Sequence, residues 1–205
     1  MQTTPDSPLR VQINGAVFAA RGGRFAPEVP GEGVPFAELK RRTHPGVSVS
    51  ATQTVRLKTN ASEVWSMITQ SFMALPAPTL TRLGIPRPIT AYFPISGGGL
   101  GQLRVCRLKP GTLWQRVLAW QPRHLLHLEM VSGEDLPRDL LACDERYEMF
   151  IDDAGWTVVR WTVTLRVRRR AALRAPLYYA AARLLQRYTI RNWRVMLVTD
   201  DWLPW

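Results

Sequence analysis

Cysteine and histidine are scarce in this chain. Its 205 residues include three histidines and two cysteines, Cys106 and Cys143. Two cysteines cannot build a disulfide framework, so we expect two small buried thiols in a reducing compartment and a cytoplasmic protein. Structural zinc sites use four cysteine or histidine ligands. Because no such set is grouped in the sequence, we predict no metal site and no cofactor.

Long apolar runs are also missing. No window approaches the roughly 18–20 consecutive apolar residues of a membrane span. The N-terminal residues, MQTTPDSPLR, do not have the basic region followed by an apolar region that marks a secretory signal. Hydrophobic residues make up 46% of the chain and charged residues 21%. This composition predicts one globular domain with a core, plus a tail.

Acidic residues are few, and they are absent from one long segment. The net charge is +11, and residues 154–199 contain ten arginines and no aspartate or glutamate. Such a field favours anionic partners, namely nucleic acid, acidic lipid headgroups or an acidic protein. No zinc-finger, recognition-helix or RNA-binding signature is present, so nucleic acid is disfavoured. Arginine also outnumbers lysine 24 to 3, so compositional bias and a solvated face explain part of the excess.

Residues 1–46 differ from the rest of the chain. They are rich in proline and glycine, and Asn14-Gly15 stands between apolar residues in RVQINGAVF. Asn-Gly in this position favours a β-hairpin. The segment has too few apolar residues for a core of its own. We therefore predict an N-terminal extension over 1–46, with a small hairpin at 10–19, and a single ligand-binding domain over 47–205.

Within that domain the pattern predicts one strand, two short helices, six strands and one long helix. The first strand is SVSATQTVRLKT, which alternates and is rich in valine and threonine. Asn60 and Glu63 form a capping-box-like start to a helix over 61–75, with Val64, Ile68 and Phe72 on one face. A second helical turn follows in TLTRLG. The six strands are expected at 89–95, 101–108, 112–120, 123–131, 142–152 and 156–168, joined by hairpin-like turns.

The long helix, over 174–199, carries two apolar stripes. We interpret one stripe as its inner side, formed by Leu177, Ala181, Leu184, Tyr188 and Val195, with Leu185 and Asn192 beside it. Four arginines, at positions 183, 187, 191 and 194, lie at one edge. The second stripe contains Tyr179, Ile190, Trp193 and Leu197. A surface helix normally has a single apolar stripe, so we predict that residues 1–45 or a second copy of the chain, in a homodimer, covers this second stripe.

The chain resembles the START / polyketide-cyclase-like (SRPBCC) superfamily, whose helix-grip fold is shared with the major birch-pollen allergen. The resemblance covers about residues 47–199. It rests on the long helix and on four stretches: TVRLKTNASEVWSMIT, GLGQLRV, VLAWQPRHLLHLEM and DERYEMFIDDAGWTVVRWTVTL. It implies an α+β fold in which a curved, seven-stranded antiparallel sheet wraps around the C-terminal helix. It also implies a cavity between helix and sheet, and a lipid, polyketide or similar hydrophobic ligand.

Strand alternation selects candidate residues for that cavity. In the strand at 123–131, His124 and Leu128 fall on the more apolar face, and His127 falls on the other. In the strand at 142–152, Glu145 and Tyr147 share the apolar face. The complete set of ligand-binding candidates is Arg104, His124, Leu128, Glu145, Tyr147, Trp161, Leu184, Tyr188 and Asn192. The phase of Arg104 is not fixed by its own strand.

Three functions follow from these features. The first is binding of a hydrophobic small molecule between the C-terminal helix and the sheet, as pockets of this kind are mainly apolar with a few polar groups. The second is a cyclase or dehydratase without a metal, in which Glu145 and a tyrosine, Tyr147 or Tyr188, act on the substrate. The third is a peripheral role on an anionic membrane or a protein, through the arginine-rich helix.

Overall fold

The computed structural model describes residues 46–73, 75–94 and 98–198 and, before them, the backbone of three strands. These strands are β1 (Leu9–Ile13), β2 (Ala16–Arg21) and β3 (Arg24–Pro27), and they form a small antiparallel sheet. Ile13 pairs with Ala16, which is the register of the predicted hairpin. Asn14 and Gly15 lie outside the described residues. That residues 1–46 form an extension and not a second domain stays a prediction.

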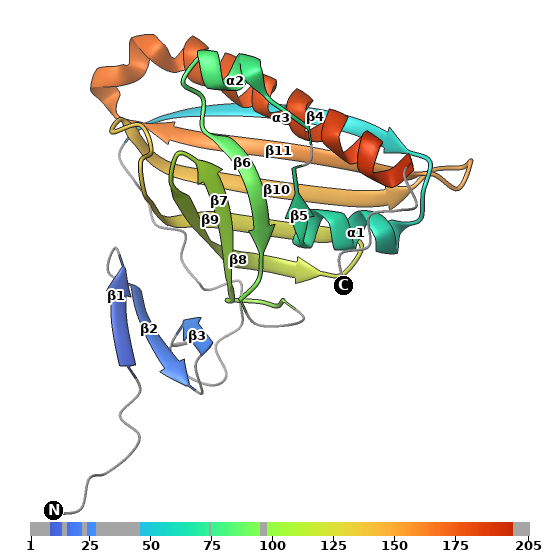
Figure 1. The fold of residues 1–205 in the computed structure, drawn as a ribbon, viewed down its shortest axis with the longest axis horizontal. Helices are drawn as coiled ribbons and strands as arrows, with labels where there is room; N and C mark the ends of the chain where they lie inside the picture. Colours follow the sequence, from blue (N-terminus) through green and yellow to red (C-terminus); the bar gives the residue numbers. More distant parts are fainter. Residues whose placement is uncertain are drawn as a thin grey trace, which may run out of the picture.

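An eight-stranded antiparallel sheet forms the body of the molecule (Figure 1). Its order is β4-β11-β10-β9-β8-β7-β6-β5. The strands are β4 (Val47–Leu57), β5 (Ser71–Phe72), β6 (Arg87–Tyr92), β7 (Leu103–Lys109), β8 (Thr112–Gln121), β9 (Leu125–Gly133), β10 (Leu140–Ile151) and β11 (Thr157–Val167). Apart from the long connection that brings β4 beside β11, neighbouring strands follow one another in sequence. The predicted order of elements and the helix-grip fold class are confirmed.

The strand count of seven was wrong, because a short strand replaces the end of a predicted helix. Helix α1 (Ala61–Thr69) stops six residues before the expected end at Leu75. The next residues form β5, where Phe72 pairs with Thr90 of β6. Phe72 had been assigned to the buried face of the helix, and its side chain is half-exposed. Thr69, whose hydroxyl donates to the carbonyl of Trp65, ends the helix with a β-branched residue that disfavours further turns.

The start of α1 agrees with the prediction. The Asn60 side chain accepts a hydrogen bond from the backbone N–H of Glu63 at 2.9 Å, and its amide donates to the Glu63 carboxylate at 2.6 Å. The first bond satisfies a backbone N–H of the helix end that would otherwise lack a partner, and the second holds the two side chains together. The second short helix, α2 (Pro78–Arg82), overlaps the helical turn predicted in TLTRLG. It begins at a proline, a residue that is favoured in the first helical turn.

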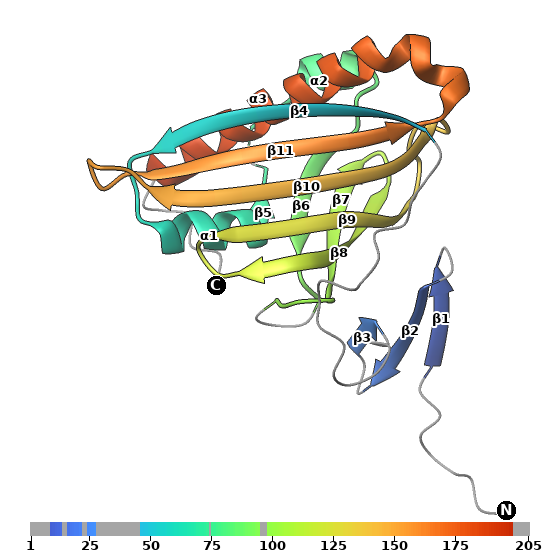
Figure 2. The same ribbon diagram turned by 180° about the vertical axis from the view of Figure 1, so that it is seen from behind.

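The C-terminal helix lies across the sheet. A turn of 3-10 helix, η2 (Arg169–Arg174), leads into α3 (Ala175–Val198). Figures 1 and 2 show α3 running along β4 and β11, with α2 beside it. The main core lies between α3, α1 and the concave side of the sheet. It includes Val64, Leu126, Val159 and Trp193. None of the described helices is long and apolar enough to cross a membrane.

The buried side of α3 is the opposite of the one predicted. The side chains that face the sheet are Ala182, Gln186, Thr189, Ile190, Trp193 and Met196. Leu177 and Val195, from the predicted inner stripe, are exposed. The reason is that the buried stripe includes a small residue, Ala182, and two polar residues, Gln186 and Thr189. A count of large apolar residues therefore favoured the side of the helix that is exposed. Gln186 is completely buried, and its amide donates to the carbonyls of Ala51 and Trp161, both at 3.0 Å.

This orientation also changes what covers the second stripe. Ile190 and Trp193 pack in the core against the sheet, so neither the N-terminal residues nor a second copy is needed to cover them. The assignment of Ile190 and Trp193 to the outer face of the helix was therefore wrong, whereas a homodimer through that outer face stays a prediction. Tyr179, from the same stripe, lies one turn after the start of α3 and is exposed.

Candidate functional site

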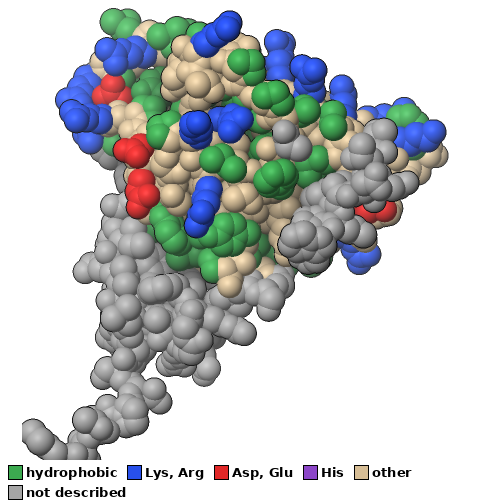
Figure 3. Space-filling view, viewed as in Figure 1, with side chains coloured by type: hydrophobic (Ala, Val, Ile, Leu, Met, Phe, Trp, Pro, Cys, Tyr) green, Lys and Arg blue, Asp and Glu red, His purple; other side chains and the backbone are tan. Residues whose placement is uncertain are grey.

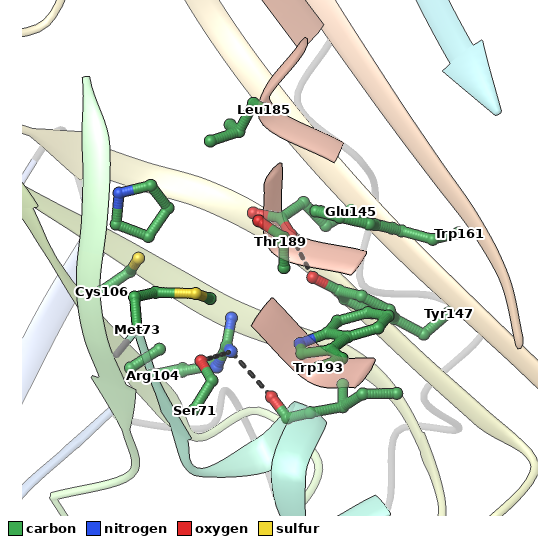
Figure 4. Close-up of a pocket in the computed structure, with 13 residues that line it drawn as sticks. Ser71, Met73, Arg104, Cys106, Glu145, Tyr147, Trp161, Leu185, Thr189 and Trp193 are labelled. Carbon is green, nitrogen blue, oxygen red and sulfur yellow. Dashed lines mark hydrogen bonds between the residues drawn. The ribbon is translucent and has the colours of Figure 1, made fainter. Parts of the chain in front are cut away.

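A cavity lies between α3 and the sheet, where the fold class predicts one. Side chains from α1, β5, β6, β7, β10, β11, α3 and the residue that follows β5 line it: Ile68, Ser71, Met73, Pro88, Ala91, Arg104, Cys106, Glu145, Tyr147, Trp161, Leu185, Thr189 and Trp193. Figure 4 draws all of them, with the Arg104 guanidinium, the Glu145 carboxylate and the Tyr147 hydroxyl around the middle of the lining. The cavity volume is about 40 Å³, which is room for a few water molecules.

Arg104 is the buried cation of the site. It lies on β7 and only 4% of it is exposed. One guanidinium nitrogen, Nη1, donates to the side-chain oxygen of Gln115 at 2.9 Å. The other, Nη2, donates to the carbonyl of Ile68 at 2.8 Å. That carbonyl belongs to the last turn of α1, where a positive charge is favourable. Arg104 thus joins the end of α1 to the sheet.

Gln115 connects Arg104 to a carboxylate. Its side chain on β8 is completely buried, and its amide nitrogen donates to Glu145 Oε1 at 2.7 Å. Tyr147 donates its hydroxyl proton to the other oxygen of Glu145. The result is a continuous Arg104–Gln115–Glu145–Tyr147 chain of hydrogen bonds. A buried charge is costly unless it is paired and hydrogen-bonded, and this chain brings both charges within one network.

Aromatic side chains form one wall of the cavity. Tyr147 stacks on Trp161 with ring centroids 5.3 Å apart, and Trp161 lies 5.4 Å from Trp193. Burial, with the nearby Glu145 charge as a smaller cause, raises the pKa of Tyr147. The phenol therefore stays protonated at neutral pH and remains a donor. The wall can contact the flat or apolar part of a ligand.

Several polar atoms of the lining residues have no hydrogen-bond partner within the part of the chain that the structure describes. They are Arg104 Nε, Trp161 Nε1, Trp193 Nε1 and Thr189 Oγ1, and each is buried. Three of the four are N–H donors. A buried donor without a partner costs about 1–3 kcal/mol, so native structures pair most such groups with protein, ordered water or ligand.

Both cysteines are free and buried, as predicted. Cys106 lines the cavity, and burial raises its pKa from 9.0 to about 12. Burial likewise raises the pKa of Cys143. Each side chain is therefore a neutral thiol that behaves as a small apolar group and not as a nucleophile. Over the described residues, no three histidine, cysteine, aspartate or glutamate side chains come together.

Four of the predicted site residues line the cavity: Arg104, Glu145, Tyr147 and Trp161. Leu128 is completely buried but belongs to the core beside it. Leu184 is half-buried and does not line the cavity. His124 is exposed and precedes β9 in a turn, where its N–H donates to the carbonyl of Gln121 at 2.9 Å. The strand was expected to start at 123, but Arg123 has a φ of 66°, which interrupts it.

Tyr188 and Asn192 fix a loop and do not line the cavity. The Asn192 side chain accepts from the N–H of Leu75 at 3.1 Å and donates to the carbonyl of Phe72 at 3.0 Å. The Tyr188 hydroxyl donates to the carbonyl of Leu75. Both residues were predicted as polar ligand contacts. Their observed role is to attach the segment between β5 and α2 to the side of α3.

Sequence reasoning missed Gln115, Thr189 and Trp193. Gln115 did carry a signal, because it stands between Leu113 and Val117 on the buried face of a strand. A glutamine in an apolar row marks a buried hydrogen bond. Thr189 and Trp193 were missed because the helix was assigned the opposite orientation. Ser71 and Met73 were missed because the segment around them was predicted as helix.

The fold is that of START-superfamily proteins, as comparison with solved structures shows. A START superfamily protein from Mycobacterium smegmatis superposes with a TM-score of 0.54 and 11% identity over 73% of this chain and 97% of that one. A protein from Mesorhizobium loti gives 0.52 with 16% identity over 74% and 98%. The protein Ara h 8.0201 gives 0.52 with 9% identity over 75% and 100%. No family model matches the sequence, and no curated protein does either.

Proposed function

We propose that this protein binds a small, mainly apolar molecule that carries a hydrogen-bond acceptor, in the cavity between α3 and the sheet. The observation that carries the proposal is the set of unpaired buried donors on the lining residues, Arg104 Nε, Trp161 Nε1 and Trp193 Nε1. A carbonyl, ether or carboxylate oxygen would accept from them. An apolar ligand without an acceptor would leave every one of them unpaired.

The aromatic wall supports an apolar body for the ligand. Tyr147, Trp161 and Trp193 offer ring faces, and Ile68, Met73 and Leu185 offer aliphatic contacts. The cavity of about 40 Å³ is smaller than the roughly 150 Å³ that holds one benzene ring, so even a one-ring ligand requires side chains of the lining to move. A larger lipid or polyketide requires the lining to move, since drug-sized ligands occupy pockets of roughly 300–1,000 Å³. Met73 and Leu185 are partly buried, and methionine adapts readily to different neighbours.

Two matched probes test this proposal. Acetophenone has an acceptor oxygen, and ethylbenzene has nearly the same shape without one. Calorimetric titration should show acetophenone binding roughly 3- to 10-fold more tightly, the value of one net hydrogen bond. Thr189→Leu, which fills the cavity, should abolish binding of both probes, whereas Ser66→Leu at an exposed position of α1 should not. Equal affinities for the two probes, or binding unaffected by Thr189→Leu, would contradict the proposal.

A second candidate function is acid–base catalysis in the same cavity. It is favoured by one observation, the direct hydrogen bond from Tyr147 to the Glu145 carboxylate beside the unpaired donors. In such a reaction Glu145 would take a proton from a carbon next to a ligand carbonyl, and the donors would stabilise the enolate oxygen. This proton transfer is the first step of the reaction in the cyclase or dehydratase hypothesis.

Proton exchange tests this candidate. In D₂O the wild-type protein should accelerate deuterium incorporation into the methyl group of acetophenone, followed by NMR. Glu145→Gln keeps the shape and the contact with Gln115, and should remove the acceleration while retaining acetophenone affinity. Exchange no faster than in buffer would exclude this role and leave the binding proposal standing.

A further inference from the structure

The outward side of α3 is basic and apolar at once. With about 100° of turn per residue, Leu177, Arg187 and Arg191 lie on the side opposite the buried Gln186 and Trp193, and all three are exposed. Leu177 is 69% exposed, and Leu173 in η2 is 96% exposed. We call the set Leu173, Leu177, Arg187, Arg191 and Arg194 the Arg–Leu face. Figure 3 shows hydrophobic and basic side chains interleaved over α2 and α3.

Acidic groups of the described residues do not neutralise this face. Arg170 and Arg174 share Asp139, each at 3.3 Å. Within residues 46–198, as far as they are described, no carboxylate pairs with Arg187, Arg191 or Arg194. The sequence explains why: there is no aspartate or glutamate from 154 to 199. Within the described part of the molecule, the charges of these three arginines are therefore not compensated by a carboxylate.

We propose that the Arg–Leu face docks on the surface of an anionic lipid bilayer. Arginines beside the bilayer attract its negative headgroups, and exposed leucines gain free energy by entering the interface between headgroups and acyl chains. Interfacial helices combine the same two kinds of side chain. A nucleic acid would use the arginines but offers nothing to a leucine that is almost completely exposed, so the membrane surface accounts for both.

Docking on this face would bring the bilayer close to the cavity. The buried side of α3 supplies Leu185, Thr189 and Trp193 to the cavity lining, and its opposite side carries the Arg–Leu face. The helix would thus lie between a membrane and the proposed ligand site. The membrane proposal does not depend on the ligand proposal, because it uses different side chains.

Vesicle flotation with the full-length chain tests the proposal. Wild-type protein should float with vesicles of 70% phosphatidylcholine and 30% phosphatidylglycerol in 50 mM NaCl, and much less in 300 mM NaCl, because salt screens the attraction. It should not float with pure phosphatidylcholine vesicles. The absence of flotation with the anionic vesicles at low salt would overturn the proposal.

Two double variants separate charge from apolar insertion. Arg187→Glu with Arg191→Glu should weaken binding by roughly 25-fold or more, since each arginine contributes about fivefold. Leu173→Ser with Leu177→Ser should weaken it by roughly tenfold or more. The four replaced side chains are two arginines and two leucines, and all four are exposed. Both variants should therefore keep the fold, which circular dichroism can verify.

Matched controls carry the same changes on other elements. Arg107→Glu with Lys109→Glu, at exposed positions of β7, gives the same change in net charge. Phe150→Ser with Ile151→Ser removes two half-exposed apolar groups at the end of β10. Neither control should reduce flotation more than about twofold. Losses equal to those of the Arg–Leu variants would mean that net charge or total apolar surface matters, not this face, and would contradict the proposal.

Two further results would replace the membrane by another partner. If only the arginine variant loses binding and a 20-bp DNA duplex displaces the protein from vesicles, the face binds nucleic acid. If wild-type protein sediments as a dimer and the leucine variant as a monomer, a second copy covers the face. Either result overturns the membrane proposal.

Discussion

At the scale of single residues, the site depends on Gln115. It is the only link in hydrogen bonds between the Arg104 guanidinium and the Glu145 carboxylate that the described residues provide. Because one amide serves as acceptor for the cation and as donor for the anion, a buried guanidinium and a partly buried carboxylate are accommodated without direct contact. Removing it would leave both groups short of one partner.

We expect Gln115→Leu to lower the free energy of unfolding by roughly 3 kcal/mol, because buried charged groups that lose a partner retain their desolvation cost. Gln121→Leu is a matched control at the exposed end of the same strand, and it should change stability by less than about 0.5 kcal/mol. Urea denaturation measures both values. A loss for Gln115→Leu no larger than for the control would show that the network does not stabilise the fold.

The Cys106 thiol makes stability sensitive to alkaline pH. Its pKa rises from 9.0 to about 12 on folding because of burial. Below pH 9 the thiol is neutral in both states and its contribution is complete. Between about pH 9 and 12 the unfolded thiol ionises and the folded one does not, so the unfolded state binds fewer protons and stability falls as pH rises.

The slope from one such group is about 1.4 kcal/mol per pH unit. Cys106→Ala should therefore lose stability less steeply than wild type between pH 9 and 10.5, measured as urea unfolding free energy at several pH values. The other titrating groups act equally in both proteins. Parallel pH dependences would show that Cys106 does not titrate as its burial requires.

At the scale of elements, the orientation of α3 decides the site. The helix is held by polar contacts on its inner and lateral sides: Gln186 donates to two sheet carbonyls, and Asn192 joins the segment at 72–75. These contacts make polar side chains part of the buried surface. A prediction based on apolar periodicity cannot recognise them, which is why it exchanged the two sides of this helix.

Comparing the stability losses of Trp193→Ala and Leu177→Ala tests which side of α3 faces the core. Trp193 is buried in the core, and its truncation should cost roughly 3–5 kcal/mol. Leu177 is exposed, and its truncation should change stability by less than about 0.5 kcal/mol. Chemical denaturation of the two variants gives the comparison. A larger loss for Leu177→Ala would restore the orientation predicted from the sequence.

Strands were predicted more reliably than helices, for a physical reason. Side chains of a strand alternate between two faces, so a single buried residue fixes the rest of the strand. Glu145 and Tyr147 were thus placed correctly beside Met149, and Trp161 beside Val159. Arg104 could not be placed, because Leu103 to Cys106 are buried on both faces of β7. His124 was misplaced because the left-handed Arg123 ends the alternation.

At the scale of the whole molecule, the order of elements was sufficient to predict the fold. One strand, two short helices, a run of antiparallel strands and a long helix leave the concave sheet only one large partner. What the order could not predict was the length of the sheet, since β5 has only two residues. Nor could it predict the size of the cavity, which depends on how Met73, Leu185 and the tryptophans fill the space.

The central claim is that the cavity binds an acceptor through unpaired donors, and NMR of the tryptophan side chains tests it most directly. Indole N–H signals can be assigned with Trp161→Phe and Trp193→Phe variants, and Trp65 and Trp120, which pack on each other away from the cavity lining, serve as internal controls. On titration with acetophenone, the signals of Trp161 and Trp193 should move downfield as they gain an acceptor, and ethylbenzene should not move them downfield. If the Trp161 and Trp193 signals do not respond, or respond no more than those of Trp65 and Trp120, the account of the cavity as a binding site is wrong.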